Sequence, residues 1–399
     1  MLLRRTGRLP RPRRGEPDRS LAASSRGVVM LNWRDPWHPE GGGSEMYVAE
    51  IAARLAAQGT PVTVFTARYP GSAARETRDG VHYRRRGGHL TVYLWALLFL
   101  ATGRLGRPEA VLEVQNGMPF LARLVTRARV VVLVHHVHRE QWPVVGPVLA
   151  RLGWFLESRV AVRLNRGAPY IAVSDTTRRE LIQLGVTAAD IAVAYNGLPA
   201  MPPRVPRQRS AEPSIVVLSR LVPHKQVEHA LRLLDDLRDE MPTLTLTIVG
   251  SGWWEDHLLA LRDELDLGSR VLFTGHVPDA EKYDHLEPAW VHLLPSIKEG
   301  WGLAIIEAAR VGVPSIAYRA AGGVQESILD GVTGLLADGQ PDLAARVRTL
   351  LTDASLRQEM GRKAQLRTEE LSWDAAATKI RAQLFSTAST VPSTPHSSA

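Results

Sequence analysis

The sequence predicts an α/β protein of two domains, each built on a doubly wound parallel sheet. Its 399 residues exceed what one hydrophobic core usually organises, at about 150 residues per domain. Short apolar segments alternate with helix-patterned segments in two successive series, which is typical of parallel sheets covered on both faces. A stretch rich in Pro and Arg, residues 199–213, separates the two series. These features together predict two Rossmann-like halves of similar size.

The first series opens with an apolar strand at residues 28–31 and a Gly-rich loop at 41–43. A helix over 44–58 follows, because its apolar residues recur at helical spacing, and Gly59 ends it. The next strand covers residues 62–66. Three further strands are predicted in this half, at 111–114, 130–134 and 170–173.

The alternation restarts beyond the Pro-rich stretch. Five buried strands are predicted there, at 215–219, 244–249, 271–274, 291–294 and 315–318. The predicted organisation has six parts: a disordered basic tail (1–26), an N-terminal domain (27–200), a linker (201–213), a C-terminal domain (214–372), a terminal helix that packs back on the N-terminal domain (373–385) and a disordered tail (386–399).

The positive charge is concentrated in the first tail. The chain carries a net charge of +8, but residues 1–26 hold eight arginines against two acidic residues. The remaining body therefore carries only about +2, which disfavours nucleic-acid binding. Cysteine is absent, and this excludes a disulfide framework, a thiolate zinc site and a cysteine nucleophile.

The longest apolar run, residues 90–101, is twelve residues long, whereas a helix that spans a bilayer needs about 20. Two interpretations stay open for it. One is a buried helix of an α/β domain; the other is an interfacial segment whose aromatic side chains and neighbouring arginines suit an anionic membrane. The N-terminus lacks the apolar region of a signal peptide. We expect a cytoplasmic protein, and the second interpretation adds peripheral contact with the inner face of the cell membrane.

Candidate site residues follow the predicted strands, where doubly wound sheets bind their ligands. Gly41, Gly42 and Gly43 precede a helix, so their backbone N–H groups can approach an anion. The alternative is a Gly-rich turn without a ligand. The loop is not a GxGxxG dinucleotide fingerprint, and no Walker A sequence occurs in the chain. Both observations disfavour NAD binding and P-loop chemistry.

Three histidines, His135, His136 and His138, follow the strand at 130–134. No matching carboxylate or thiolate cluster is visible in the sequence, so we expect neither a metal nor another cofactor. A histidine at the carboxyl end of a strand is better interpreted as a polar contact with substrate. Three nearby aromatic residues suit either an acceptor groove or packing: Trp142, Trp154 and Phe155.

The second half places cations and glycines after its own strands. Arg220 and Lys225 follow the first of these strands and suit a diphosphate, with solvated surface charge as the alternative. Gly250 and Gly252 follow the second strand and allow another close approach of the backbone.

Two glutamates follow the strand at 291–294. Glu299 lies on the predicted loop, and Glu307 lies about one and a half turns inside a helix that begins near Gly302. Carboxylates so placed accept hydrogen bonds from the hydroxyls of a sugar or ribose. The free N–H groups at the helix start would meanwhile face a phosphate.

This ordered series resembles the retaining nucleotide-sugar glycosyltransferases of GT-B fold, family 4. The resemblance extends from about Gly27 to Phe385. It rests on the following elements: Gly42-Gly43-Ser44-Glu45, His135, Val173-Ser174, Asn196-Gly197, Arg220 with Lys225, Gly250-Ser251-Gly252, Gly275-His276-Val277, and Glu299-Gly300-Trp301-Gly302-Leu303 with Glu307. It implies two Rossmann domains that face a cleft, with the nucleotide-sugar donor held mainly by the C-terminal domain.

The resemblance implies a role for each matching position. Arg220 and Lys225 would hold the donor diphosphate, and His135 would contact the donor sugar near the reacting carbon. The other implied contacts are Glu307 with the ribose hydroxyls, Glu299 with hydroxyls of the transferred sugar, the backbone of Gly302 and Leu303 with phosphate and sugar, His276 and Val277 with the base, and Gly42 and Gly43 with the diphosphate. Family members commonly have His followed by Asp where this chain has His135-His136, so His136 is the alternative active histidine.

The implied activity is transfer of a hexose from a UDP- or GDP-sugar, with retention and without a metal. The acceptor is not identified by the sequence; a lipid-linked or cell-envelope glycan precursor fits the apolar run. A non-catalytic nucleotide-sugar sensor or subunit of the same fold is the alternative, although it would need fewer of these residues. A glycogen-phosphorylase-like enzyme would need a lysine that binds pyridoxal, and the chain has only five lysines.

Overall fold

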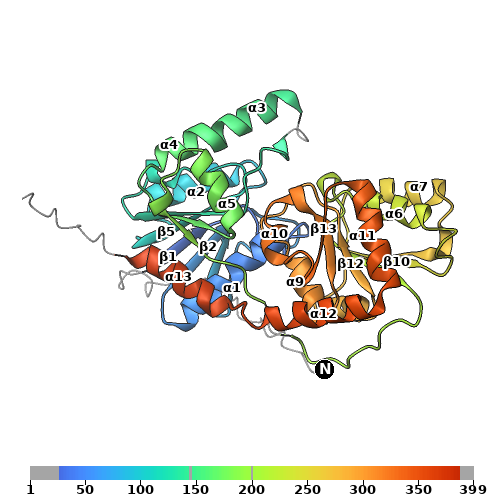
Figure 1. Cartoon of the computed structure of the whole chain (residues 1–399). Coiled ribbons are helices and arrows are strands. Elements are labelled where there is room, and N and C mark those ends of the chain that lie inside the picture. The colour runs from blue at the N-terminus through green and yellow to red at the C-terminus, as the bar shows by residue number, and fades with distance from the viewer. Residues whose placement is uncertain (1–26, 143–145, 199–200, 387–399) are drawn as a thin grey trace, which may run out of the picture.

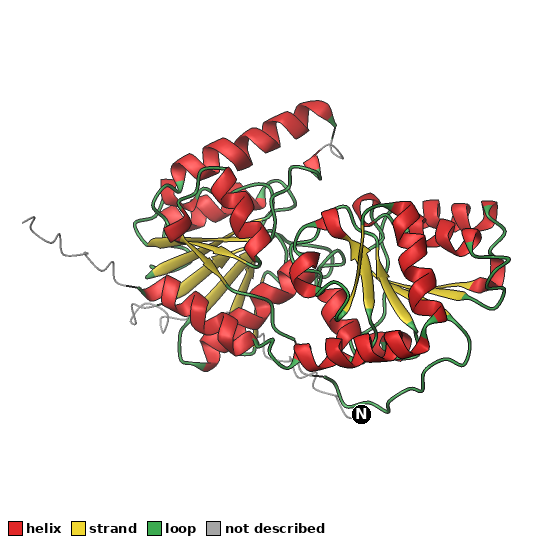
Figure 2. Ribbon diagram, in the orientation of Figure 1, coloured by secondary structure: helices red, strands yellow, loops and turns green. Residues whose placement is uncertain are grey.

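The computed structural model describes residues 27–142, 146–198 and 201–386. The chain forms two α/β domains side by side, each with a sheet between helices (Figures 1 and 2). This confirms the predicted fold class. The predicted tails, at 1–26 and beyond Ser386, lie outside the described residues.

The N-terminal sheet has eight strands in the order β3-β4-β2-β1-β5-β6-β7-β8. Their bounds are β1 (Val28–Leu31), β2 (Val62–Thr66), β3 (Arg75–Arg78), β4 (Val81–Arg85), β5 (Ala110–Gln115), β6 (Arg129–Val134), β7 (Tyr170–Ala172) and β8 (Ile191–Val193). Every neighbouring pair is parallel except β3 with β4. These two strands form a hairpin around Asp79 and Gly80, whose φ angles are 51° and 75°. Such left-handed pairs suit the right-handed twist of a two-residue hairpin.

Helices cover both faces of this sheet. They are α1 (Gly43–Ala57), α2 (Val92–Ala101), α3 (Pro147–Phe155), α4 (Val162–Leu164) and α5 (Asp175–Gln183). The core on one face joins α1 to the terminal helix α13 (Trp373–Phe385), and the core on the other face contains the inner side of α2. Between α3 and α4 the chain forms a π-helical turn, Leu156–Ala161.

The C-terminal sheet has six parallel strands in the order β11-β10-β9-β12-β13-β14. Their bounds are β9 (Ser214–Leu218), β10 (Thr245–Val249), β11 (Val271–Gly275), β12 (Val291–Leu294), β13 (Ser315–Tyr318) and β14 (Gly334–Ala337). The covering helices are α6 (Glu228–Asp236), α7 (Glu255–Glu264), α8 (Lys282–Leu286), α9 (Leu303–Arg310), α10 (Val324–Ser327), α11 (Gln340–Thr352) and α12 (Ala354–Thr368).

Helix α13 returns to the N-terminal domain. Trp373, at its first position, is 2% exposed and packs edge-on against Tyr47 of α1, with ring centroids 5.2 Å apart. A Cβ atom at Gly197 would lie 2.2 Å from the backbone nitrogen of Trp373. Only glycine therefore fits where the chain leaves the N-terminal domain, because α13 fills the adjacent space.

The described part of the predicted linker lies along the C-terminal domain. Arg209 donates hydrogen bonds to the backbone carbonyls of Glu287 and Ala289 at 2.8 Å and 2.6 Å. Arg204 forms an ion pair with the Glu287 carboxylate at 2.7 Å. These arginines attach the linker to the C-terminal domain, so the linker is not a flexible segment between the two domains.

Most of the apolar run at 90–101 forms α2, one face of which is buried as the first interpretation expects, while the interfacial interpretation stays a prediction. Val92, Ala96 and Leu100 are buried against the sheet. Leu94 and Leu98 on the other side are 68% and 45% exposed. No helix within the described ranges is long and apolar enough to cross a membrane.

Candidate functional site

The carboxyl ends of the two sheets face each other, and loops from both domains touch there. Sheet order reverses between β1 and β5 in the first domain and between β9 and β12 in the second, and such reversals are where doubly wound sheets bind ligands. Arg220, after β9, donates to the Glu40 carbonyl at 3.2 Å. A Cβ atom at Gly300, after β12, would lie 2.2 Å from the His135 carbonyl oxygen. The loops that carry Arg220 and Gly300 therefore meet the N-terminal domain at this junction.

Helix α10 provides a second contact between the domains. The Glu326 carboxylate accepts hydrogen bonds from the backbone nitrogens of Asp175 and Thr176, both at 2.7 Å. These nitrogens belong to the first turn of α5, where a carboxylate is favoured by the free N–H groups and the helix dipole. Lys298 also forms an ion pair with Glu180 of α5. These contacts could not be predicted from the sequence, since they arise only when the domains meet.

Lys225 and Glu299 form the central charged contact of the C-terminal side. Lys225 Nζ lies 2.5 Å from Glu299 Oε1, and the side chains are 15% and 12% exposed. The backbone joins the two loops as well, because Ile297 donates to the His224 carbonyl at 2.9 Å. The fold thus brings together two residues that are 74 positions apart in the chain.

The Gly-rich loop of the N-terminal domain reaches across to this charged region. A Cβ atom at Gly42 would lie 3.4 Å from Arg220 Nε, and one at Gly43 would lie 2.8 Å from Leu303 Cδ1. The Glu45 carboxylate accepts from the Gly42 nitrogen at 2.7 Å and so fixes the loop. Burial alone would raise the pKa of Glu45, but Arg34 and Arg220 hold it below its ordinary value.

Gly250 and Gly252 lie against the loop that carries Arg220. Added Cβ atoms would meet the carbonyl oxygens of Ser219 and Leu221 at 1.9 Å and 2.1 Å. Leu221 also donates to the Ser251 carbonyl at 3.0 Å. Glycine is therefore required here for the close approach of two backbones, which places Arg220.

Helix α9 begins where the sequence predicts. Gly302 precedes it with φ of 84°, a left-handed conformation that favours glycine. Glu307 lies in the middle of the helix, and Lys282 of α8 forms an ion pair with it at 2.6 Å. Burial opposes the charge of Lys282, but Glu307 and Asp279 raise its pKa above the ordinary value. Lys282 was not predicted, because nothing in its spacing along the chain marks it as the partner of Glu307.

His276 and Val277 follow β11. His276 is exposed, whereas Val277 packs against the cluster that includes Tyr283 and Leu286 of α8. Because α8 also carries Lys282, which pairs with Glu307, these predicted base contacts lie beside the predicted ribose contact.

His135 and His136 point to different surroundings. The His135 ring packs edge-on against Tyr47 at 5.2 Å, and burial lowers the pKa of His135 to about 4. His136 stacks on His138 at 4.1 Å, and burial lowers its pKa further below the ordinary value, with Lys225 among the lesser causes. Both rings are therefore neutral near pH 7, and the Nε2 atom of each is buried without a hydrogen-bond partner among the described residues.

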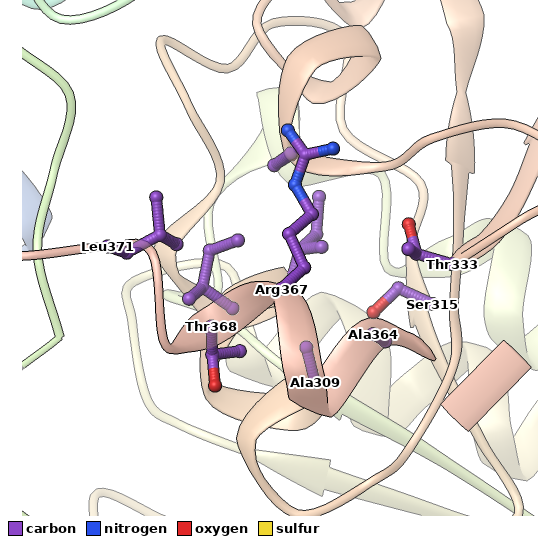
Figure 3. A pocket seen from close by; sticks show the side chains of 10 residues that line it. Ala309, Ser315, Thr333, Ala364, Arg367, Thr368 and Leu371 are labelled. Atoms are coloured by element: carbon purple, nitrogen blue, oxygen red, sulfur yellow. The ribbon is translucent and has the colours of Figure 1, made fainter. Parts of the chain in front are cut away.

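Two hollows of the structure lie away from this junction. One, of about 10 Å³, lies between α9 and α12 beside Arg367 and Thr368, and it holds too little space for a sugar (Figure 3). The other lies along the linker and is lined by residues such as Leu198, Arg204 and Glu287. Neither is lined by Lys225, Glu299 or His135. Among the residues that the structure describes, no group of three or more His, Asp or Glu side chains could hold a metal ion.

Comparison with known proteins agrees with this geometry. The model of glycosyltransferase family 4 matches residues 41–201, and that of glycosyl transferases group 1 matches residues 203–367. The chain belongs to glycosyltransferase family 4. The two matches divide near residue 202, between the two sheets.

Relatives of this family 4 protein include sulfoquinovosyl transferase SQD2 of Arabidopsis thaliana, which is 32% identical over 56% of this chain and 46% of that protein. The chain thus spans about half the length of this relative. A GDP-mannose-dependent α-(1-6)-phosphatidylinositol monomannoside mannosyltransferase of Mycobacterium tuberculosis is 29% identical over 88% of this chain and 96% of its own length.

Solved structures share the GT-B fold. Sucrose-phosphate synthase of Thermosynechococcus elongatus superposes on 89% of this family 4 chain and 97% of its own, with a TM-score of 0.77 and 20% identity. HepE of Anabaena, solved with UDP-glucose, covers 90% of this chain and 99% of its own, with a TM-score of 0.70 and 18% identity.

Proposed function

We propose that this protein transfers a hexosyl group from a UDP- or GDP-sugar to a hydroxyl-bearing acceptor, with retention of configuration and without a metal. The observation that carries the proposal is the convergence of Arg220, Lys225 and Glu299 opposite the Gly42–Gly43 loop. Two cations and a set of backbone N–H groups are what a diphosphate leaving group requires. The mannosyltransferase relative is described as GDP-mannose-dependent, and HepE was solved with UDP-glucose, so both bases remain in the proposal.

Each site residue receives a role on this basis. Arg220 and Lys225 stabilise the diphosphate, together with the backbone of Gly302 and Leu303 at the start of α9. The other proposed roles belong to Glu299 and His135 at the transferred sugar, Glu307 at the ribose, His276 and Val277 at the base, and Gly42 and Gly43 over the diphosphate. Gly250 and Gly252 act indirectly, because they place the Arg220 loop.

The proposed reaction needs no proton acceptor from the protein. The acceptor oxygen forms a bond to the anomeric carbon on the face from which the diphosphate leaves. The bond between that carbon and the phosphate oxygen breaks, and its electron pair stays on the phosphate. The acceptor proton passes to the same phosphate, while Arg220 and Lys225 offset the charge that develops there. Closure of the two domains excludes water, which limits hydrolysis of the donor.

A panel of UDP- and GDP-sugars tests the proposal by release of the nucleotide. Release from at least one donor, followed by an anomeric analysis that shows retention, supports a retaining transferase. Tight binding of a nucleotide sugar without any release, across the panel and a range of acceptors, supports the non-catalytic subunit instead. Failure to bind any of the sugar nucleotides overturns both.

We further propose peripheral contact with an anionic membrane at its inner face, made by the N-terminal domain. Four large apolar side chains on α3 are 52% to 77% exposed: Val148, Leu149, Leu152 and Phe155. Residues 84–166 also contain thirteen arginines against four glutamates. Exposed apolar side chains among cations suit an interfacial helix on anionic lipid. A lipid-linked acceptor would be reached from that position.

A further inference from the structure

A buried carboxylate organises the loop that follows β6. Glu157, on the π-helical turn, is 1% exposed. Its Oε1 accepts a hydrogen bond from the His138 backbone nitrogen at 3.1 Å and lies 3.2 Å from His138 Nδ1. Its Oε2 accepts from Trp142 Nε1 at 2.7 Å. One carboxylate therefore holds three groups of the loop that carries all three histidines.

The surroundings of Trp142 lock this loop in place. A Cβ atom at Gly153 would lie 2.3 Å from the Trp142 ring, and one at Gly117 would lie 3.0 Å from it. The indole thus occupies space that two glycines leave open, so packing fixes its position in this loop. The π-helical turn, which inserts an extra residue into a helix and often marks a functional site, places Glu157 on the inner side.

Glu157 also sets the direction of the His138 ring. A carboxylate beside Nδ1 favours a proton on that nitrogen and fixes the plane of the ring, so that Nε2 points away from Glu157. The ring stacks on His136 and is 14% exposed. The ring belongs to the same loop as His135, whose carbonyl oxygen would lie 2.2 Å from a Cβ atom at Gly300 of the other domain. His138 therefore lies close to the junction of the two domains.

We propose that His138 binds a hydroxyl of the acceptor through Nε2, and that Glu157 is the positioning residue that holds the ring for it. The proposal rests on the transferase function proposed above. Glu157 holds the His138 ring three residues from His135, whose carbonyl oxygen meets the other domain. An imidazole nitrogen held there can form a hydrogen bond with a hydroxyl group, and this holds whether or not a lipid is attached to the acceptor.

The test uses the full chain and the donor found by the panel. Three hydroxyl probes serve as acceptors: octyl α-D-mannoside, octyl β-D-glucoside and myo-inositol. The ratio of transfer to donor hydrolysis is measured for wild type, Glu157→Gln and His138→Phe. We expect the ratio to fall at least tenfold in both variants, through a higher acceptor KM, while the affinity for the nucleoside diphosphate, measured by calorimetry, stays within twofold.

The matched control is Glu140→Gln, because Glu140 is an exposed glutamate of the same loop. Trp142→Phe removes one donor to Glu157 but leaves the His138 contacts, and we expect a smaller loss. Thermal midpoints show whether each variant is folded. Variants that keep the wild-type ratio, or a wild type that uses none of the three probes, overturn this inference alone. A wild type that releases no nucleotide from any donor overturns the proposed function instead.

Discussion

Lys225 Nζ lies 2.5 Å from Glu299 Oε1, and this ion pair links the loops after β9 and β12, the two strands between which the sheet order reverses. Because both side chains are mostly buried, each would be costly to leave without the other. The Glu299 carboxylate accepts one hydrogen of the Lys225 ammonium group and so fixes its position. The other two hydrogens can then bind an anion. Arg220 then supplies the second cation from the start of the same loop.

Removal of this lysine gives the first prediction. We expect Lys225→Ala to lower kcat for nucleotide release by about 100- to 1000-fold, because loss of one donor to a developing negative charge costs about 2.7–4 kcal/mol. The control is Lys363→Ala, since Lys363 is 42% exposed and pairs with Glu359 on α12. Turnover of Lys225→Ala equal to that of the control would falsify the assignment.

Contact between the domains gives the second prediction. Gly300→Ala would place its Cβ 2.2 Å from the His135 carbonyl oxygen, so the two backbones must separate. We expect kcat/KM for the donor to fall at least tenfold and the radius of gyration in small-angle scattering to rise, while each domain stays folded. Gly88→Ala is the control, because nothing lies within 4 Å of its added Cβ. An unchanged kcat/KM would show that this contact is not needed for turnover.

The sequence predicts many of the continuously apolar strands, although β14, which is equally apolar and buried, and the three-residue β8 were not predicted. The strands at 28–31, 62–66, 291–294 and 315–318 have the bounds of β1, β2, β12 and β13. The hairpin of β3 and β4 was missed, because residues 75–85 are mostly polar and lack an apolar run. Its only local signal is the Asp79-Gly80 turn.

The site residues could be predicted from the sequence only where they belong to recognisable motifs. Glycines and charges that follow strands, such as Arg220 and Gly302, can be found by position alone. Glu157 looks like a surface residue of an ordinary helix in the sequence, and its burial depends on a π-helical turn and on the packing of Trp142. Lys282 lies 25 residues before Glu307, and only the packing of α8 against α9 joins them.

The exposed face of α3 gives the third prediction. We expect Leu152→Glu to weaken cosedimentation with phosphatidylglycerol vesicles about fivefold, since one charge near an anionic surface is worth about 1 kcal/mol. The matched control is Leu366→Glu on α12, because Leu366 and Leu152 are 50% and 52% exposed. Higher salt should weaken wild-type binding as well. Equal losses in the two variants, or no binding by the wild type at low salt, would contradict membrane contact through α3.

A buried histidine of β12 gives the fourth prediction, on stability against pH. His292 is fully buried beside Ser315, with Nδ1 2.9 Å from the hydroxyl oxygen, and burial lowers the pKa of His292 to about 3. The unfolded chain, with an ordinary pKa near 6.5, binds the proton first as pH falls. Stability is therefore complete above about pH 6.5 and is lost toward pH 3, by about 1.4 kcal/mol per pH unit.

The test compares the free energy of unfolding of wild type and His292→Asn between pH 7.5 and pH 5. The variant is less stable than wild type near pH 7.5, because it leaves a cavity, but its slope against pH should be smaller by one titrating group. His257→Asn is the control, since His257 is 52% exposed, and it should keep the wild-type slope. A slope for His292→Asn equal to that of wild type would mean that His292 can take up its proton within the folded domain.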